Sequence, residues 1–292
     1  MRIGIYDPYL DDLGGGEKYM MSAAVYFSKN HDVSVFWDNK SDLEQLKKRF
    51  ALDFSRISLE KNIFAGNVNF LKRLIRTRKL DALVFLSDGS IPFTLSKKLF
   101  IHLQQPLDGK LISSWKDRLK LSRVNAIFYN SEFTRSFNEN KLVGVVSLVI
   151  YPPVELFTKK VVKKNIILNV GRFRVINVKN EDYKKQQFMV DVFKKMVNKG
   201  LKEWTFVIAT SVKDRNDYKF KKMLKSARGF PIEFMINKTN RELWDIYNKS
   251  KIYWHASGFG EDLQKHPEYA EHFGISTVEA MGAGAVPVVI NE

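Results

Sequence analysis

The segment Glu271-His-Phe-Gly-Ile-Ser-Thr-Val-Glu279 is followed by Ala-Met-Gly-Ala-Gly and then by the apolar run 285–290. It predicts a glycine-punctuated turn, a helix near residues 276–281 and a buried strand. Backbone N–H groups at a helix start attract phosphate, and carboxylates accept hydrogen bonds from sugar hydroxyls. The segment therefore suits a ligand that carries both groups, although two solvated glutamates at this spacing are also common on surface helices.

Short apolar runs alternate with helical patterns along the whole chain, which predicts parallel sheets with helices on both faces. Strands are predicted in the first half at 2–6, 33–37, 82–86, 100–103, 126–129 and 146–150, and in the second half at 166–170, 205–209, 232–236, 252–255 and 285–290. Helices are predicted near 18–28, 184–198, 218–227, 240–248 and 276–281. Tyr151-Pro-Pro153 and the basic stretch 159–164 predict a boundary between domains 1–153 and 154–292.

The glutamate segment resembles the E-x7-E donor-binding signature of retaining glycosyltransferase family 4. The resemblance extends through Gly14-Gly-Gly-Glu17, Tyr151-Pro-Pro153 and Asn169-Val-Gly-Arg-Phe173, and so covers most of the chain. The combination is similar to dolichol-oligosaccharide α-1,2-mannosyltransferases and to bacterial polysaccharide glycosyltransferases. It implies a GT-B-like α/β fold, with two doubly wound Rossmann-like domains facing a cleft. Domain 1–153 would be the acceptor side, and domain 154–292 would bind the nucleotide-sugar donor.

In that family the second domain continues past the strand matching 285–290 with further βα units and a terminal helix, whereas this sequence stops at Glu292. The expectation is a C-terminal domain that is apparently truncated. Its last strand would have a bare side, which favours weak stability, self-association or low activity.

The resemblance assigns roles to residues of the donor segment. Glu271 would hold sugar hydroxyls, and Glu279 would hold the ribose. The backbone of Phe273, Gly274 and Ile275 would lie near the sugar and the phosphate.

Three cations and one histidine complete the implied site. Arg172 matches the arginine of the family's G-R-[LF] motif, and Lys184 or Lys185 matches the lysine that follows it. The stretch 175–183 between them is longer than the common family spacing, so the choice of lysine stays open. His102, at the end of an apolar strand, would contact the transferred sugar, but a histidine there is often a hydrogen-bonded structural residue.

Gly15 and Gly16 belong to a flexible turn before a predicted helix, where backbone N–H groups could approach an anion. The turn is not a dinucleotide fingerprint, because the third glycine position is occupied by Tyr19 and the loop from Tyr6 is too long. No cofactor is expected, and the donor substrate would be a nucleoside-diphosphate sugar, either GDP-mannose or a UDP-sugar.

Composition excludes several classes of protein and site. The 292 residues contain no cysteine, which rules out disulfides and thiolate chemistry. The sequence indicates no signal peptide and has no run of 18 apolar residues, so a cytoplasmic location is expected. His255, His266 and His272 alternate with glutamates, but their spacing matches no metal motif and no Asp-x-Asp occurs, so no metal is predicted.

The formal charge of +16, from 48 basic and 32 acidic residues, favours a polyanionic partner. No nucleic-acid motif accompanies it, and an anionic membrane surface fits better. Residues 69–79 place Phe70, Leu71, Leu74 and Ile75 on one helical face and basic residues around the other, as in a peripheral membrane helix. The alternative is a docked helix with a solvated basic face.

The expected function is a retaining, metal-independent hexosyltransferase that acts on a saccharide or lipid-linked saccharide acceptor in cell-surface glycan synthesis. Two alternatives remain open at this point. One is a noncatalytic, truncated transferase-like binding subunit, and the other is an epimerase or phosphorylase of the same fold.

Overall fold

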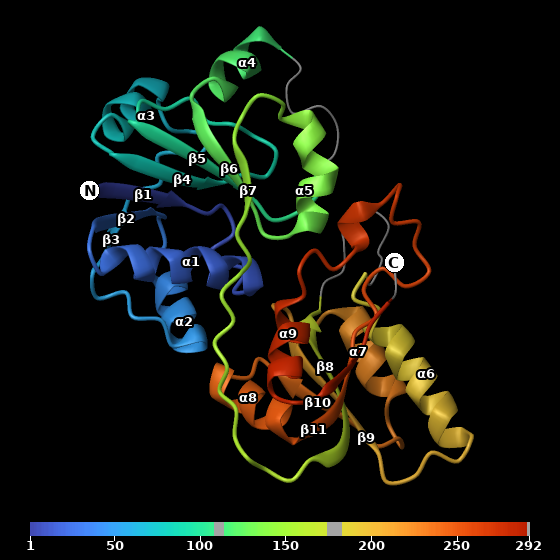
Figure 1. The fold of residues 1–292 in the computed structure, drawn as a ribbon. Coiled ribbons are helices and arrows are strands. Elements are labelled where there is room, and N and C mark those ends of the chain that lie inside the picture. The colour runs from blue at the N-terminus through green and yellow to red at the C-terminus, as the bar shows by residue number, and fades with distance from the viewer. Residues whose placement is uncertain (108–113, 174–182, 291–292) are drawn as a thin grey trace. The chain divides into compact units, whose positions relative to one another are not determined.

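A computed structural model describes residues 1–107, 114–173 and 183–290 of the chain. The chain divides into two compact units, Met1–Pro153 and Val154–Glu292. Each unit is built on one sheet whose strand pairs are all parallel, with helices on both faces (Figure 1).

The first unit has a seven-stranded sheet in the order β3-β2-β1-β4-β5-β6-β7. Its strands are β1 (Arg2–Tyr6), β2 (Asp32–Phe36), β3 (Ile57–Glu60), β4 (Ala82–Leu86), β5 (Lys98–Leu103), β6 (Val124–Tyr129) and β7 (Ser147–Val149). Its helices are α1 (Gly15–Ser28), α2 (Lys40–Phe50), α3 (Phe70–Thr77), α4 (Trp115–Leu121) and α5 (Glu132–Asn138), followed by the short 3-10 helix η1 (Glu139–Lys141).

Side chains alternate across this sheet, and each face has its own apolar cluster. Ile3 and Ile5 of β1 pack with Met20 and Met21 of α1, and with Leu46 of α2. The opposite face carries a second cluster that includes Tyr6, Leu83, Ile101, Ile127 and Leu142. Both faces of the central strands are therefore buried, as expected for a parallel sheet.

The second unit has a five-stranded sheet in the order β10-β9-β8-β11-β12. Its strands are β8 (Lys164–Arg172), β9 (Thr205–Ser211), β10 (Ile232–Ile236), β11 (Ser250–Trp254) and β12 (Val286–Val288). Its helices are α6 (Gln186–Asn198), α7 (Tyr218–Ser226), α8 (Asn240–Lys249) and α9 (Ile275–Gly282), with the 3-10 turn η2 (Pro267–Tyr269).

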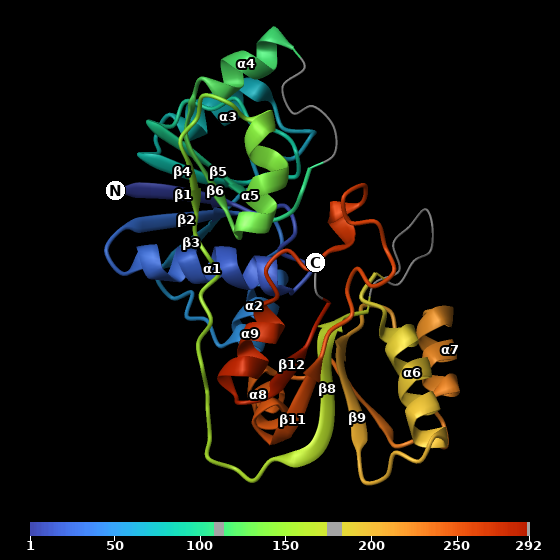
Figure 2. The same cartoon turned by 45° about the vertical axis from the view of Figure 1, so that its right-hand side comes forward.

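Helices α6 and α7 cover one face of this sheet, and α8 and α9 cover the other (Figure 2). Phe193 of α6 packs with Phe206 of β9, while Tyr247 of α8 and Ala280 of α9 pack with Tyr253 of β11. Among the described residues β12 pairs with β11 alone, and Val286 and Val288 are exposed.

The two doubly wound α/β sheets predicted from the sequence are confirmed. The segment Thr239-Asn-Arg-Glu242 forms a capping box at the start of α8, with the Thr239 N–H donating to Glu242 at 2.9 Å. The sequence analysis did not predict β3, α2, α4 or α5. Most of the stretch 175–183 lies outside the described residues.

Candidate functional site

The carboxyl ends of β8 and β11 mark the point where the strand order of the second sheet reverses. From β8 the chain proceeds to β9 and β10 on one side, and α8 then returns it to β11 on the other side. Open α/β sheets bind ligands outside the carboxyl ends of their strands at such a point. Arg172 ends β8 and His255 directly follows β11, so both residues lie at this point.

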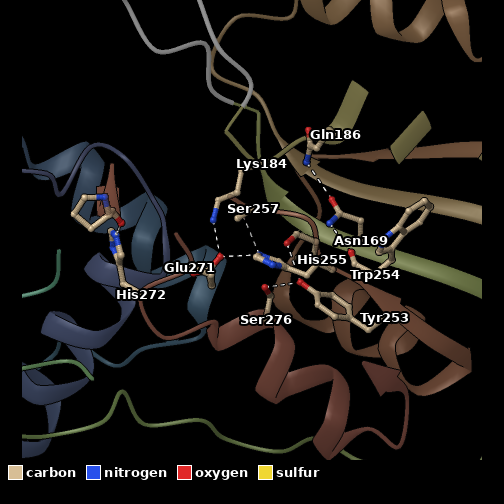
Figure 3. Close-up of polar contacts among 12 residues, drawn as sticks. Asn169, Lys184, Gln186, Tyr253, Trp254, His255, Ser257, Glu271, His272 and Ser276 are labelled. Carbon is tan, nitrogen blue, oxygen red and sulfur yellow. Dashed lines mark hydrogen bonds and ion pairs between the residues drawn. The ribbon is translucent and has the colours of Figure 1, made fainter. Parts of the chain in front are cut away.

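Glu271 contacts Lys184 and His255, which are far apart in the sequence, as Figure 3 shows. Its Oε2 accepts a hydrogen bond from Nζ of Lys184 at 2.6 Å and lies 2.7 Å from Nε2 of His255. Because an ionised carboxylate can only accept, this imidazole nitrogen is the donor. The hydroxyl of Ser257 lies 3.2 Å from the same nitrogen. Glu271 is thus the centre of a polar cluster.

The surroundings of Glu271 keep its carboxylate ionised. Burial raises the pKa of a carboxyl, but here the positive charge of Lys184 and the hydrogen bond from His255 outweigh burial. The pKa of Glu271 therefore lies well below its ordinary value. Its side chain is 30% exposed, so it remains accessible to a ligand.

Lys184 is charged for the complementary reason. Burial lowers the pKa of a lysine, yet Glu271 and the ring of Tyr183 more than compensate, and the pKa of Lys184 is raised. The positive charge of Arg172 acts in the opposite direction on Lys184. The structure therefore brings the arginine within electrostatic reach of the lysine, and two of the predicted cations share one region.

Lys185 takes a different partner from Lys184. It has a left-handed backbone, with φ of 54°, at the residue before α6. Its Nζ forms an ion pair with Oε1 of Glu261. Only Lys184 of the two lysines contacts Glu271 among the described residues, which makes it the better candidate for the family's lysine.

Buried and partly buried hydrogen bonds connect the elements of the site (Figure 3). Nδ2 of Asn169 in β8 donates to the carbonyl of Trp254 in β11 at 2.9 Å. Nε2 of Gln186, the first residue of α6, donates to Oδ1 of Asn169 at 3.3 Å. The hydroxyls of Tyr253 and Ser276 are 2.6 Å apart and fix α9 to β11. These contacts connect β8, β11, α6 and α9 next to Arg172 and His255.

Helix α9 begins directly after the turn that carries Glu271. Gly274 precedes it with φ of +79°, a conformation that residues other than glycine rarely adopt. Ile275 is the first helical residue, and Phe273 lies just before the glycine. The Thr277 N–H already donates to the Gly274 carbonyl at 2.9 Å, so the N–H groups of Ile275 and Ser276 are those that this turn can offer to an anion.

Glu279 lies inside α9 and is buried against α8. Its Oε2 accepts a hydrogen bond from the hydroxyl of Tyr247 at 3.0 Å.

A second tyrosine, Tyr253 of β11, is influenced by both glutamates. Burial raises the pKa of Tyr253, and the charges of Glu271 and Glu279 add to that increase. One tyrosine hydroxyl therefore lies within electrostatic reach of both glutamates of the motif.

In the first unit, His102 is buried at the end of β5. Its Nδ1 lies 3.1 Å from the carbonyl oxygen of Phe128, and its ring meets that of Tyr19 edge to face. Burial lowers the pKa of His102 to about 4, so the ring is neutral at pH 7. Its Nε2 has no hydrogen-bond partner among the described residues. Nδ1 of His102 thus has the hydrogen bond expected of a structural histidine, while Nε2 is buried.

In the glycine turn of the first unit, a backbone N–H donates to the carboxylate of a nearby glutamate. The Gly14 N–H donates to Glu17 of α1 at 2.5 Å. Gly16 lies against Gln104, whose Nε2 donates to the Gly16 carbonyl at 3.3 Å. Gly15 begins α1. The negative charge of Glu17 at this helix start opposes the anion binding predicted for Gly15 and Gly16.

Asp7 adds to the acidic character of this turn. Burial, followed by the charge of Glu17, raises the pKa of Asp7 to about 8. Its Oδ1 accepts a hydrogen bond from the Tyr9 N–H at 2.9 Å, while Oδ2 has no hydrogen-bond partner among the described residues. Asp7 is therefore protonated at pH 7 and can donate a hydrogen bond.

Sequence reasoning missed three contributors to these sites. The sequence pattern suggests His255 only as a metal ligand, although this residue directly follows β11 at the sheet edge where ligands bind. Glu261 and Tyr247 carry no sequence signal, because their partners are set by loop and helix packing. In the described part of the chain, no group of three or more histidine, aspartate or glutamate side chains is arranged to hold a metal ion.

Comparisons with known proteins agree with this geometry. Residues 156–292 match the family model for glycosyl transferases group 1. No curated protein sequence matches the chain significantly.

Solved structures share the fold of the whole chain. The structure of Anabaena Alr3699/HepE in complex with UDP and glucose matches with a TM-score of 0.60 and 14% identity, covering 99% of this chain and 80% of that one. TarM matches with a TM-score of 0.68 and 11% identity, covering 99% and 84%. The UDP-GlcNAc 2-epimerase from Neisseria meningitidis bound to UDP-GlcNAc matches with a TM-score of 0.50 and 12% identity, covering 87% and 77%.

At these identities the structural matches establish the fold but not the reaction, since an epimerase has it as well. The predicted GT-B-like fold is confirmed. Residues 156–292, which match the family model for glycosyl transferases group 1, contain both glutamates and the lysine cluster.

Proposed function

We propose that the protein is a hexosyltransferase that takes its sugar from a nucleoside-diphosphate donor bound by the second unit. The observation that carries the proposal is the cluster of Lys184, His255 and Glu271. It lies at the carboxyl edge of the sheet, in the region that matches the glycosyl transferases group 1 family. A cation beside a carboxylate suits a ligand with a diphosphate at one end and sugar hydroxyls at the other.

The roles follow from charge and position. Arg172 and Lys184 are the cations that would bind the diphosphate, together with the N–H groups at the start of α9. Glu271 would accept hydrogen bonds from the sugar hydroxyls, and Glu279 from the ribose. Lys184 is held by Glu271 in the structure, so it is already positioned when a donor enters.

The transfer would depend mainly on stabilising the leaving group. The acceptor hydroxyl attacks the anomeric carbon while the bond from that carbon to the diphosphate oxygen breaks. The leaving nucleoside diphosphate takes up negative charge, which Arg172 and Lys184 would balance, and it can accept the proton of the acceptor hydroxyl. Retention of the anomeric configuration is inferred from the resemblance of the Glu271 to Glu279 segment to family 4 enzymes.

No metal ion is required in this proposal, because the two cations and the helix start supply positive charge. We infer a saccharide or lipid-linked saccharide acceptor in cell-surface glycan synthesis, again from the resemblance. Activity in EDTA should match activity with added manganese. Loss of transfer in EDTA that manganese restores would refute a metal-independent mechanism.

Donor binding is the first test. Thermal unfolding with UDP, GDP and their sugar derivatives should identify a ligand that raises the melting temperature, and a ligand at 100 times its Kd stabilises by about 2.7 kcal/mol. Arg172→Ala should weaken binding of that nucleoside diphosphate far more than binding of the nucleoside alone. Equal losses for both ligands would remove Arg172 from the phosphate site.

Incubation of donor with acceptor separates transfer from its alternatives. A glycosyltransferase releases nucleoside diphosphate together with a new glycoside. An epimerase would change the sugar without an acceptor, and a noncatalytic binding subunit would bind the donor and leave it intact. A phosphorylase would need a pyridoxal cofactor, which an absorbance spectrum of the purified protein would reveal.

A further inference from the structure

Helix α3 in the first unit exposes three of its four apolar side chains, while the fourth, Leu74, is half-buried. Phe70, Leu71 and Ile75 are 50%, 64% and 63% exposed. Arg73 faces inward instead, because its Nε donates to the Ile63 carbonyl at 3.0 Å. A surface helix of a globular domain normally buries its apolar stripe, so this orientation requires an explanation.

Helix α4 repeats the pattern with different residues. Trp115 is 71% exposed and Leu119 is 50% exposed, and the spacing of four residues places them on one face. None of the residues of α4 is buried. Because α4 also exposes an apolar face, the exposed apolar side chains of α3 are less easily explained by chance.

The two helices are linked through the loop between β4 and β5. The N–H of Leu95 donates to Oγ1 of Thr77, the last residue of α3, at 3.0 Å. Nη2 of Arg123, just after α4, donates to the Ser96 carbonyl at 3.1 Å. Leu95 is itself 37% exposed. Figures 1 and 2 draw α3 and α4 at the same end of the first unit.

Basic side chains surround these apolar residues. They are Lys72, Arg76, Arg78 and Lys79 in or just after α3, and Lys116, Arg118 and Lys120 in α4. The acidic residues nearby are engaged by bases: Glu60 lies 3.9 Å from Arg76, and Asp117 lies 3.4 Å from Lys120. The surface therefore carries a net positive charge.

We propose that this α3–α4 surface binds an anionic lipid bilayer. Exposed Trp, Phe, Leu and Ile side chains can enter the boundary between headgroups and acyl chains, while lysines and arginines contact lipid phosphates. Nucleic acid would use the basic residues but would give the aliphatic side chains no partner. Binding to a bilayer would bring an enzyme close to a lipid-linked substrate. The lipid binding proposed here does not depend on the proposed transferase activity.

The test is sedimentation of the purified full chain with vesicles. Phosphatidylcholine vesicles should leave the protein in the supernatant, and vesicles with about 30% phosphatidylglycerol should bind it at low salt and release it at high salt. Emission of Trp115 should shift to the blue on binding, and Trp115→Phe should abolish that shift. Equal binding to neutral and anionic vesicles, or binding that salt does not affect, would overturn the proposal.

Variants identify the surface. Leu71→Asp with Ile75→Asp, and separately Lys72→Glu with Lys79→Glu, should lower vesicle affinity about tenfold or more. The matched control is Lys221→Glu with Lys222→Glu on the exposed side of α7, which changes the net charge equally and should leave most of the affinity intact.

Two further results would count against this surface. Equal losses in the control and in the α3 variants would attribute binding to overall charge alone. If Leu71→Asp with Ile75→Asp instead dissolves a dimer seen by sedimentation velocity, the apolar residues bind a second copy of the chain. Because every substituted side chain is exposed, circular dichroism should show an unchanged fold.

Discussion

Replacing Glu271 by glutamine tests the centre of the candidate site. The change keeps the shape of the side chain and removes the charge that accepts hydrogen bonds from Lys184 and His255. A hydrogen bond to a charged group contributes about 1.5–3 kcal/mol and a neutral one about 0.5–1.5 kcal/mol, so each bond loses about 1 kcal/mol. Two such bonds give about 2 kcal/mol, and we expect about 1–2 kcal/mol because solvent screens a partly exposed pair.

The assay is urea unfolding of four proteins: wild type, Glu271→Gln, Lys184→Met and the double variant. The free energies of unfolding should be non-additive by about 1 kcal/mol, because both single changes remove the same ion pair. Glu233→Gln, an exposed glutamate of β10, is the control and should change stability by less than about 0.5 kcal/mol.

Ligand binding gives a second measurement on the same proteins. Glu271→Gln should weaken binding of the donor sugar nucleotide more than binding of the nucleoside diphosphate, since the carboxylate is assigned to the sugar. Additive losses in urea, or a Glu271→Gln protein as stable as wild type, would show that the contact between Lys184 and Glu271 contributes nothing. Unchanged donor binding would remove Glu271 from the sugar site.

Three further predictions concern single positions. Because the pKa of Asp7 is raised from 3.8 to about 8, the folded state retains a proton that the unfolded chain releases, so the free energy of unfolding falls as the pH rises between these values. Asp7→Asn should abolish that fall. Equal slopes of unfolding free energy against pH for the two proteins, measured with urea, would contradict this prediction. Gly274→Ala forces alanine into the left-handed region, at 3.3 Å from two side chains, and should cost about 1–3 kcal/mol by thermal unfolding. Gly200 also has a positive φ, but an added Cβ there would meet no atom within 4 Å, so Gly200→Ala should lower the stability less than Gly274→Ala does. Equal losses for the two variants would show that backbone strain alone, and not the close contacts at Gly274, causes the loss. Tyr247→Phe removes the bond to Glu279 and should cost about 1.5–3 kcal/mol in urea, which an unchanged midpoint would refute.

The central strands of the two sheets could be predicted because parallel strands buried on both faces are continuous apolar runs. The strand β3 was missed because it has four residues at the edge of the sheet, none of them fully buried. Helices α2, α4 and α5 each begin with a side-chain cap, from Asn39, Ser114 and Ser131. Those caps were readable in the sequence and were not used.

The site was only partly predictable. The motif identified Glu271, but the contact with His255 depends on how the loop between β11 and α9 folds back, and no local pattern encodes that path. The apolar face of residues 69–79 was visible in the sequence, whereas its outward direction was not. Periodicity shows that a helix has two faces but not which face the rest of the domain covers.

The four apolar clusters of the fold each draw their residues from one unit. Two belong to Met1–Pro153 and two to Val154–Glu292. Among the described residues, each unit therefore has apolar cores built from its own side chains. Because a unit with its own core could in principle fold alone, recombination near Tyr151-Pro-Pro153 would exchange one whole folding unit for another.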